Sequence, residues 1–236
     1  MHSAREWLRE ARSIAVLTGA GVSAESGVPT FRGAGGLWKR QRAENLATPE
    51  AFARDPKLVW EWYDWRRGVL ADVKPNPGHY ALAELECRSK NFTLITQNVD
   101  GLHELAGSRN VLRVHGSIWM LRCLGCGREE ENRRSPLGEL PPHCECGGML
   151  RPGVVWFGES LPADVWKAAE AAARSCDLLL VIGTSAVVYP AAGLSHLAKS
   201  SGARVVEINI VETPLSRDID EFLLGPSGEL LPQLIA

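Results

Sequence analysis

The feature that most constrains the fold is a short apolar run that leads directly into a glycine-rich turn. Residues 14–17 read Ile-Ala-Val-Leu, a composition typical of a strand buried in a parallel sheet. Gly19, Gly21 and Ala24 follow with the spacing G-x-G-x-x-A, the dinucleotide-binding fingerprint with alanine in the third place. The glycines let the backbone approach a pyrophosphate, and the N–H groups of the next helix start face that anion. The turn therefore predicts a nucleotide-binding strand–loop–helix unit.

The residues after this turn are unlike those of a dehydrogenase. Gly27 and Pro29 stop the helix within about two turns. The segment from Pro29 to Arg32 (Pro-Thr-Phe-Arg) then brings a hydroxyl, an aromatic ring and a cation near the phosphates, where it can cover a nucleotide and exclude water. No clear ribose-binding acid follows a second strand, which also disfavours hydride transfer.

Strands and helices alternate along most of the chain, which predicts an α/β fold with a Rossmann-like, doubly wound parallel sheet. Further strands are expected at 92–96, 111–114, 178–182 and 204–210, and helices at 2–12, 76–87, 162–174 and 190–199. Two stretches break the alternation, a helical insertion at 33–76 and a cysteine- and glycine-rich insertion at 117–151. We expect these insertions to form a small lobe, and residues 1–32, 77–116 and 152–236 to form the nucleotide-binding lobe.

Composition limits the partners of this chain. Its 236 residues, 45% of them hydrophobic, are enough for one full core, or for one core and a small module. A formal net charge of −2 gives no general attraction to nucleic acid or to an anionic membrane. No apolar run approaches the roughly 18 residues that span a bilayer, and the first residues lack the apolar region of a secretory signal. We therefore expect a cytoplasmic protein that binds neither nucleic acid nor membrane.

Four of the six cysteines have the spacing of metal ligands. Cys123 and Cys126 form a C-x-x-C pair, Cys144 and Cys146 form a C-x-C pair, and glycines beside each pair allow tight turns. Four sulfurs without a nearby carboxylate pattern predict a closed, tetrahedral zinc site with a structural role. His143 is a competing candidate ligand.

Three alternatives for the cysteine module stay open at this point. One is a redox pair of thiols, and another is plain packing of the cysteines in a core. The third is a nucleic-acid-binding ribbon, which is disfavoured because the acidic run 129–131 dilutes the nearby arginines. The remaining cysteines, Cys87 and Cys176, lie in apolar surroundings and are expected to pack in the core.

Seven features of the chain, in this order and spacing, resemble the sirtuin family. They are Gly19-Ala20-Gly21-x-Ser23, Pro29-Thr30-Phe31-Arg32, Gln97-Asn98-Val99-Asp100, His115-Gly116, the four cysteines, Trp156-Phe157-Gly158-Glu159 and Gly183-Thr184-Ser185. The resemblance extends from about residue 11 to residue 232 and implies an NAD-dependent protein-lysine deacylase. It implies that NAD is consumed as a co-substrate, that nicotinamide and O-acyl-ADP-ribose are released, and that the active site lies between the two lobes.

The resemblance also implies roles for polar residues near the middle of the chain. His115 is the implied catalytic base for a ribose hydroxyl, and an imidazole with a pKa of about 6.5 suits that task. Asn98, the second implied catalytic residue, contacts the ribose and a positioned water. Asp100 belongs to the nicotinamide site, and Gln97 lies against the ribose hydroxyls. His103 has no such role and is expected to be structural.

A larger set of residues is implied to contact NAD. The set is Gly19, Ala20, Gly21, Ser23, Ala24, Thr30, Phe31, Arg32, Gln97, Asn98, Val99, Asp100, Gly183, Thr184, Ser185, Asn209 and Ser227. In this set the turn 183–185 offers N–H and hydroxyl donors to a phosphate and the adenine ribose. Asn209 ends the last expected strand beside the adenosine ribose, and Ser227 lies near the adenine.

The protein substrate is implied to bind as an extended peptide. The stretch 154–158 resembles the peptide-docking strand of the family, with Val155, Phe157 and Gly158 as substrate-binding residues. Such a peptide adds to a sheet edge through main-chain hydrogen bonds, which predicts loose sequence specificity.

One pair of residues indicates which acyl groups are removed. Tyr63 and Arg66 are three residues apart on an expected helix, so they share a face and can bind a carboxylate at the end of an acyl chain. Ala43 and Ala47 leave room there, as in sirtuins that act on succinyl- and malonyl-lysine, and some deacetylase activity is expected as well. The alternative is that Arg66, beside Arg67, is a solvated surface charge.

Three other activities compete with this interpretation. A protein ADP-ribosyltransferase would use the same nicotinamide-releasing chemistry. A sensor of NAD without catalysis is disfavoured by His115, and a dehydrogenase is disfavoured by the interrupted helix after Gly27.

Overall fold

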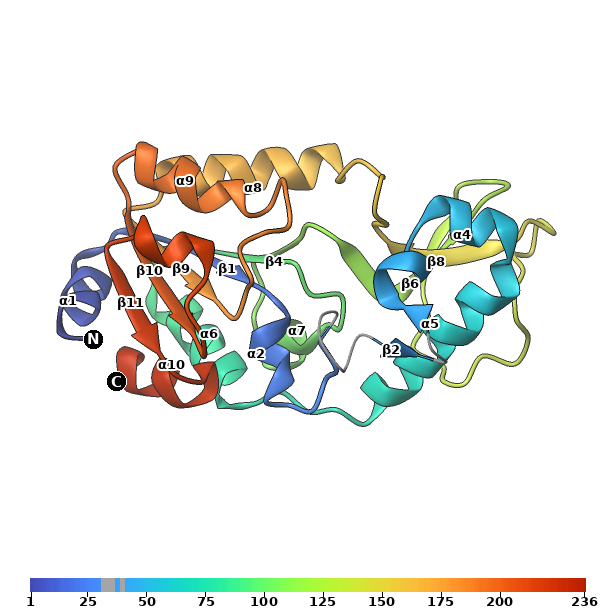
Figure 1. Ribbon diagram of the computed structural model, residues 1–236, viewed down its shortest axis with the longest axis horizontal. Helices are drawn as coiled ribbons and strands as arrows, with labels where there is room; N and C mark the ends of the chain where they lie inside the picture. The colour runs from blue at the N-terminus through green and yellow to red at the C-terminus, as the bar shows by residue number, and fades with distance from the viewer. Residues whose placement is uncertain (31–36, 39–40) are drawn as a thin grey trace.

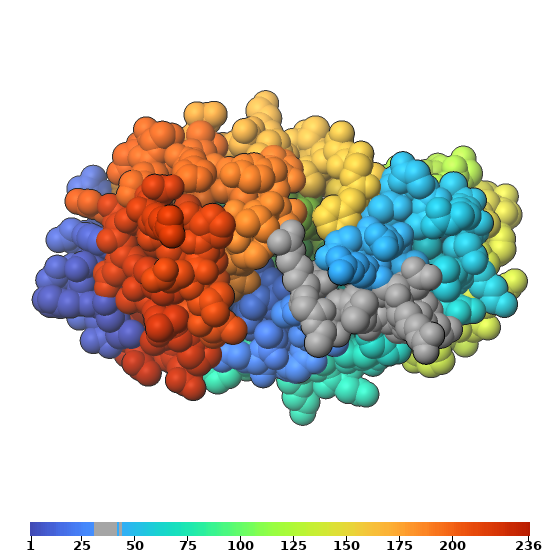
Figure 2. Space-filling model, viewed as in Figure 1, coloured from blue at the N-terminus to red at the C-terminus, as the bar shows by residue number. Residues whose placement is uncertain are grey.

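The computed structural model describes residues 1–30, 37–38 and 41–236, which form two lobes along the long axis of the molecule (Figure 1). The sheet lobe contains both chain termini, and the small lobe contains helices α4 and α5. Figure 2 shows the two lobes in contact, with the C-terminal elements in red and orange at one end. The residue boundaries expected for the two lobes stay a prediction.

The sheet lobe is built on parallel strands. In the described residues six strands form one sheet in the order β11-β10-β9-β1-β4-β5. They are β1 (Ser13–Thr18), β4 (Asn91–Thr96), β5 (Val111–Arg113), β9 (Leu178–Ile182), β10 (Arg204–Asn209) and β11 (Glu221–Leu224). After β1 the chain adds β4 and β5 on one side of it, and then adds β9, β10 and β11 on its other side. The doubly wound parallel sheet is confirmed, and its switch point lies between β1 and β9, where ligands of such sheets bind.

Helices cover both faces of this sheet, because alternate side chains of β1 point to opposite faces. Ile14 and Val16 pack in one cluster with α1 (His2–Glu10), α6 (Pro77–Arg88) and α10 (Ser227–Ile235). Ala15 and Leu17 pack in another cluster with α8 (Ala163–Ser175) and α9 (Gly193–Ser200). Figure 1 shows α8 and α9 on one side of the strands and α6 and α10 on the other.

The small lobe combines helices with an antiparallel sheet. Its helices are α3 (Ala43–Leu46), α4 (Pro49–Arg54) and α5 (Pro56–Ala71). Thr48 and Asp55 begin α4 and α5, since each side chain accepts a hydrogen bond from the first turn and proline follows. Among the residues given above, three strands pair in the order β7-β6-β8, with β6 at Gly116–Cys123, β7 at Glu129–Glu131 and β8 at Leu150–Val154. A short pair, β2 (Leu37–Trp38) and β3 (Gln41–Arg42), lies outside this sheet.

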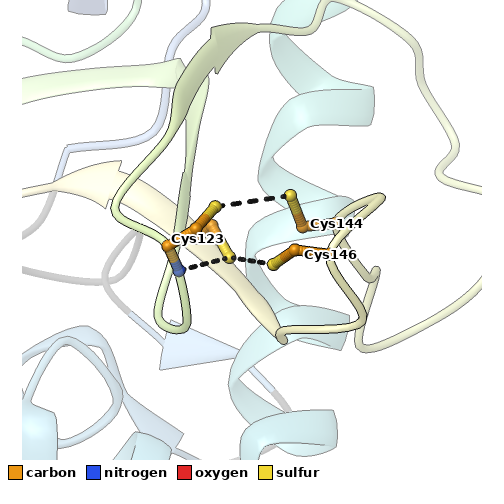
Figure 3. Close-up of side chains that lie close together, drawn as sticks. Cys123, Cys144 and Cys146 are labelled. Atoms are coloured by element: carbon orange, nitrogen blue, oxygen red, sulfur yellow. Dashed lines mark hydrogen bonds between the residues drawn. The ribbon is translucent and has the colours of Figure 1, made fainter.

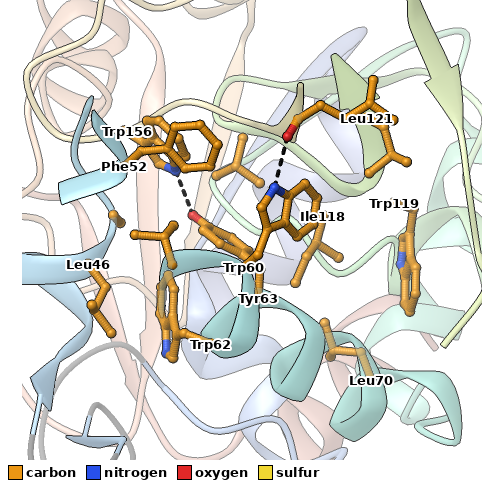
Figure 4. Close-up of a cluster of buried hydrophobic side chains, with 14 of the residues drawn as sticks. Leu46, Phe52, Trp60, Trp62, Tyr63, Leu70, Ile118, Trp119, Leu121 and Trp156 are labelled. Carbon is orange, nitrogen blue, oxygen red and sulfur yellow. Dashed lines mark hydrogen bonds between the residues drawn. The ribbon is translucent and has the colours of Figure 1, made fainter. Parts of the chain in front are cut away.

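An aromatic cluster forms the core of the small lobe. Trp60, Trp62, Tyr63 and Trp156 are all buried there, as Figure 4 shows. Trp60 donates its indole N–H to the carbonyl of Leu150 in β8, at 2.8 Å, so the helix and the sheet are joined at the centre of this core.

Four features of the fold differ from the expectation or were missed. Strand β6 was not predicted from the sequence. Most of its side chains are buried on both faces, so its residues do not alternate between polar and apolar as those of a half-exposed strand do. Strand β11 and helix α10 were missed as well. Cys176 is buried as expected, but the expectation for Cys87 is wrong, since it is exposed. Cys87 follows Leu85, which is buried, by two residues, and this spacing turns it to the solvent face of α6.

None of the helices within the described ranges is long and apolar enough to cross a membrane.

A buried asparagine joins two elements of the sheet lobe, and its removal tests the packing there. Asn76 accepts hydrogen bonds from the N–H groups of Gly78 and His79, and it donates to Val22 O at 2.7 Å. Asn76→Ala should lower the free energy of unfolding by about 2–4 kcal/mol, because it removes a helix cap and leaves a buried carbonyl unpaired. Urea unfolding measures this change.

The matched control is Thr48→Ala, which removes a cap with a single bond, to Ala51 N–H. This control should cost about 1 kcal/mol. Equal losses in the two variants would show that the bond from Asn76 to Val22 contributes nothing.

Candidate functional site

A cavity of about 360 Å³ lies at the carboxyl ends of β1, β4 and β9, where the two lobes meet. The turn after β1, the loop after β4 and the turn after β9 line it from the sheet lobe. Ala47 and Arg66 line it from the small lobe.

Most of the expected site residues line this one cavity. They are Gly19, Ala20, Gly21, Ser23, Thr30, Arg66, Gln97, Asn98, Val99, Asp100, His115, Val155, Phe157, Gly158, Gly183, Thr184 and Ser185. Segments that are far apart in the sequence therefore come together as the resemblance implied.

Other expected residues lie elsewhere. In the described part of the chain, Ala24, Tyr63, Asn209 and Ser227 do not line the cavity. Ser227 is buried and donates to a carboxylate oxygen of Glu25 at 2.7 Å, so it fixes the start of α10. Phe31, Arg32 and the side chain of Ala43 lie outside the described residues.

The two glycine turns approach each other more closely than side chains would allow. Gly21 donates its N–H to Gly183 O at 2.7 Å, and a Cβ added at Gly21 would lie 2.7 Å from Gly183 Cα. Gly183 itself has a φ of +58°, in the region that favours glycine. Asn209 donates to Thr184 O at 2.8 Å and so positions the second turn.

Buried polar groups form a network behind the cavity wall. Asn98 donates to Gly19 O at 3.0 Å and to Ser23 Oγ at 3.1 Å, and Ser23 in turn donates to Asp100 at 2.8 Å. Burial raises the pKa of Asp100, while the hydrogen bonds from Leu102 N–H and Ser23 lower it. The network holds the Asn98 amide and the Asp100 carboxyl in fixed orientations.

His79, a buried histidine of this network, was not among the residues expected at the site. Its Nε2 lies 3.4 Å from Ser23 Oγ, and its ring packs 4.9 Å from that of His103. Burial lowers the pKa of His79 to about 3 and that of His103 to about 4, so both are neutral. The available signal was the capping-box pattern Asn-x-x-His at Asn76. His103 lies 3.0 Å from Thr18 Oγ1 and does not line the cavity, which fits the structural role expected for it.

His115 has a defined tautomer. Its Nδ1 lies 3.1 Å from Gln97 O, and a carbonyl only accepts hydrogen bonds, so Nδ1 carries the proton. Nε2 is then the lone-pair nitrogen. Burial lowers the pKa of His115 below its ordinary value, which keeps the imidazole unprotonated at Nε2 at neutral pH.

The alternative that Arg66 is a solvated surface charge is wrong. Arg66 is 8% exposed, lines the cavity, and has its guanidinium carbon 5.3 Å from the Trp62 ring centroid. Burial lowers its pKa, and the charges of Tyr63 and Asp100 act in the opposite direction. Tyr63 packs behind it, with its hydroxyl oxygen accepting the indole N–H of Trp156 at 2.8 Å (Figure 4).

The segment after β8 is tied firmly to the small lobe. Arg151 binds both carboxylate oxygens of Glu159, at 2.6 and 2.8 Å, and its guanidinium lies 3.6 Å from the Trp156 ring centroid. Glu159 also accepts the main-chain N–H of Trp156. The segment that carries Val155 and Phe157 is therefore held from both of its ends.

The four cysteines meet at one point, as Figure 3 shows for three of them by label. Their sulfur atoms lie within 4.8 Å of one another, with Cys123 to Cys146 at 3.5 Å and Cys126 to Cys144 at 3.9 Å. Tetrahedral zinc with bonds of about 2.3 Å needs sulfurs about 3.8 Å apart, so the set fits zinc. In the described residues His143 is not part of this cluster, and none of the four cysteines lines the cavity. The zinc prediction is confirmed, and the distance from the cavity fits a structural role.

Known proteins share this arrangement. A model of the Sir2 family matches residues 19–190. The NAD-dependent protein deacylase 2 of Pyrobaculum aerophilum is 57% identical over 229 residues, which covers 97% of this chain and 92% of that protein. The NAD-dependent protein deacylase sirtuin-5, mitochondrial, of Danio rerio is 46% identical over 255 residues, which covers 97% of this chain and 84% of that protein.

Solved structures agree with the sequence relatives. A complex of a Sir2 homolog with NAD has a TM-score of 0.95 and 49% identity, and the match covers 100% of this chain and 92% of that one. A Sir2 complex with a p53 peptide and NAD⁺ has a TM-score of 0.86 and 31% identity, and the match covers 98% and 95%. The fold and the site define a Rossmann-like, NAD-dependent enzyme with a separate zinc module. The chain belongs to the Sir2 family, the sirtuins.

Removal of the metal tests the role of the cysteine module. The protein should contain about one tightly held zinc ion per chain by elemental analysis. Chelation or Cys123→Ala should lower both the thermal midpoint and the activity, because the small lobe loses the ion that joins its two cysteine turns.

Cys87→Ala is the control for this experiment. It changes an exposed cysteine outside the module and should leave zinc content and activity at the level of the unmodified protein. Full activity in metal-free protein would refute the structural role of the zinc.

Proposed function

We propose that this sirtuin removes acyl groups from protein lysines with NAD as co-substrate, and that it prefers acyl chains that end in a carboxylate. Succinyl- and malonyl-lysine are the proposed preferred substrates, and acetyl-lysine is a weaker one. The observation that carries the preference is Arg66, a guanidinium that lines the same cavity as His115.

The proposed NAD site uses the two glycine turns and the loop after β4. The N–H groups of Gly19, Gly21 and Gly183 already donate to main-chain carbonyls, so the proposed donors for phosphate are the N–H groups of the residues beside them in the two turns. Bound NAD supplies a ribose carbon that receives the acyl oxygen as nicotinamide leaves. The named NAD complex of a close structural relative supports this assignment.

His115 and Asn98 are the proposed catalytic residues. Because Gln97 O holds the Nδ1 proton, Nε2 of His115 is the atom that takes the proton of a ribose hydroxyl. The amide nitrogen of Asn98 is occupied by Gly19 O and Ser23, so its Oδ1 is left to accept a hydrogen bond from a ribose hydroxyl or water.

The protein substrate is proposed to bind beside Val155 and Phe157 as an extended strand. Val155 N–H donates to His115 O and Phe157 N–H donates to Ala47 O, so these two donors are already used. In the described chain the carbonyls of Val155 and Phe157 accept no hydrogen bond, and they are the groups available to an added strand.

Arg66 and Tyr63 are proposed to bind the acyl carboxylate. The burial of Arg66 strengthens its attraction to a carboxylate, since solvent screens the pair less than at a surface. The Tyr63 hydroxyl accepts from Trp156, and its own proton has no acceptor among the described residues. Because Tyr63 does not line the cavity, it is proposed to donate only to a carboxylate that is inserted beside Arg66. Burial raises the pKa of Tyr63, which keeps this donor protonated.

A test of the reaction itself uses succinylated peptide, NAD and mass spectrometry. Free lysine peptide and O-acyl-ADP-ribose are the expected products. ADP-ribosylated protein in their place would indicate the ADP-ribosyltransferase instead.

Replacement of His115 tests the base. His115→Ala should leave NAD binding intact and lower deacylation by about 10²–10⁴-fold, the usual contribution of a positioned acid–base group. In the unmodified enzyme, kcat/KM should fall as the pH drops through the pKa of His115, which burial holds below the ordinary value, and should not fall at neutral pH. His103→Ala, a buried histidine outside the cavity, is the control for NAD affinity. Near-normal turnover by His115→Ala would remove this residue from the mechanism.

Replacement of Arg66 tests the acyl preference. Arg66→Met leaves the substrate carboxylate without a partner, at a cost of about 3–5 kcal/mol. This cost corresponds to a loss of roughly 10²–10³-fold in kcat/KM for a succinyl peptide. Turnover of acetyl peptide should stay the same or improve, because acetyl-lysine has no carboxylate there. Equal losses on both peptides would contradict the preference.

Tyr63→Phe is the companion variant, and the structure gives it two effects. Loss of the donor to the carboxylate should cost about 0.5–3 kcal/mol on succinyl peptide alone. Loss of the hydroxyl that accepts the indole N–H of Trp156 should lower kcat/KM for both peptides, since Trp156 lies in the segment beside the substrate. Only the difference between the two peptides measures the acyl contact.

A further inference from the structure

Arg67 is a cation buried in the small lobe. Its side chain is 0% exposed, and within the described residues no ion pair joins it to an acidic group, although the charge of Asp64 raises its pKa. Burial lowers the pKa of Arg67 to about 10, so the guanidinium remains charged at neutral pH. A buried charge of this kind is costly unless polar groups surround it.

Carbonyl oxygens supply those polar groups. Arg67 donates to Ile118 O at 2.8 Å, to Asn132 O at 2.5 Å and Oδ1 at 3.0 Å, and to Arg134 O at 2.8 Å. Ile118 lies in β6, and the other acceptors follow β7. One side chain of α5 therefore binds two separate segments of the small lobe.

The strand that Arg67 binds also holds the wall of the cavity. Ile118 donates its N–H to Val99 O at 3.0 Å, and Trp119 donates its indole N–H to Asp100 O at 2.6 Å. The guanidinium carbon of Arg67 lies 5.1 Å from the Trp119 ring centroid, so it contacts the same indole. Arg67 therefore contacts the two residues of β6, Ile118 and Trp119, that donate hydrogen bonds to main-chain carbonyls of the cavity wall.

Arg66 is the next residue on the same helix. Successive residues of a helix point about 100° apart, which lets Arg66 face the cavity while Arg67 faces β6. We infer that Arg67 is a positioning residue that fixes Arg66, at the acyl end of the cavity, relative to Asp100, at the nicotinamide end. The inference rests on the proposed function.

Two substitutions at Arg67 test this inference. Arg67→Lys keeps the charge and the aliphatic stem but cannot bind all four acceptors, and Arg67→Met removes every donor. The measurements are kcat and KM for succinyl and acetyl peptides, the concentration of nicotinamide that halves the rate, and the thermal midpoint.

The expected signature is a change in selectivity. A displacement of about 1 Å can cost on the order of 10²-fold, so kcat/KM on succinyl peptide should fall roughly 10–100-fold further than on acetyl peptide. The loss should lie mainly in KM, and nicotinamide inhibition should weaken several-fold. Arg67→Lys should retain more of the succinyl selectivity and of the nicotinamide inhibition than Arg67→Met.

Arg133→Met is the matched control. Arg133 also lies over the Trp119 ring, at 5.5 Å, but it is exposed and pairs with Glu131. Its loss should leave the succinyl-to-acetyl ratio and the nicotinamide inhibition within about twofold of the unmodified enzyme, because such exposed pairs contribute little.

Two results overturn the inference. One is a folded Arg67→Lys enzyme whose succinyl-to-acetyl ratio of kcat/KM equals that of Arg133→Met. The other is a folded Arg67→Lys enzyme that nicotinamide inhibits at the same concentration as Arg133→Met. If Arg67→Met does not fold, Asn132→Ala takes its place, since it removes one acceptor of Arg67 at a partly exposed position. Equal losses on both peptides in Arg66→Met would instead overturn the proposed function and the inference with it, so the two failures are distinguishable.

Discussion

The close approach of two backbone turns is the constraint on which the site depends. Gly21 and Gly183 lie in the segments that follow the neighbouring strands β1 and β9, and their main chains are in direct contact through a hydrogen bond of 2.7 Å. Because no Cβ fits between them, the sheet can bring both turns to the same edge of one cavity. The loop after β4 joins them through Asn98, whose amide binds Gly19 O. Asn98, Asp100 and His115 each have a main-chain hydrogen-bond partner, so the backbone of the sheet lobe sets their positions.

Burial shifts the pKa values of the ionisable groups around this cavity. Burial keeps His115 neutral, raises the pKa of Asp100 and makes the charge of Arg66 more costly. The same low dielectric strengthens the interaction of a buried charge with an opposite charge, since solvent screens the pair less. Under the proposed function, this effect favours an acyl chain that ends in a carboxylate beside Arg66.

The parts of the fold that sequence could predict are those with local signals. The strands 14–17 and 178–182 are uninterrupted apolar runs, and the four cysteines carry their own spacing. Strand β6 could not be found in this way, because its hydrophobic side chains are buried together in the aromatic cluster and do not alternate with polar ones. The exposure of Cys87 depends on which face of α6 meets the sheet, and the position of Tyr63 behind the cavity wall depends on its contact with Trp156. These properties depend on tertiary contacts, which a short stretch of sequence does not determine.

The attachment of Trp156 has a consequence for how a substrate is recognised. Tyr63, Arg151 and Glu159 hold this residue, so the edge offered to a peptide belongs to a rigid core. A rigid edge of main-chain carbonyls can pair with almost any extended chain, and it has little means of telling one protein from another. Under the proposed function, discrimination then falls to the deep end of the cavity, where the acyl group ends. Such an enzyme would select its substrates by the acyl group on the lysine and hardly at all by the sequence of the protein that carries it.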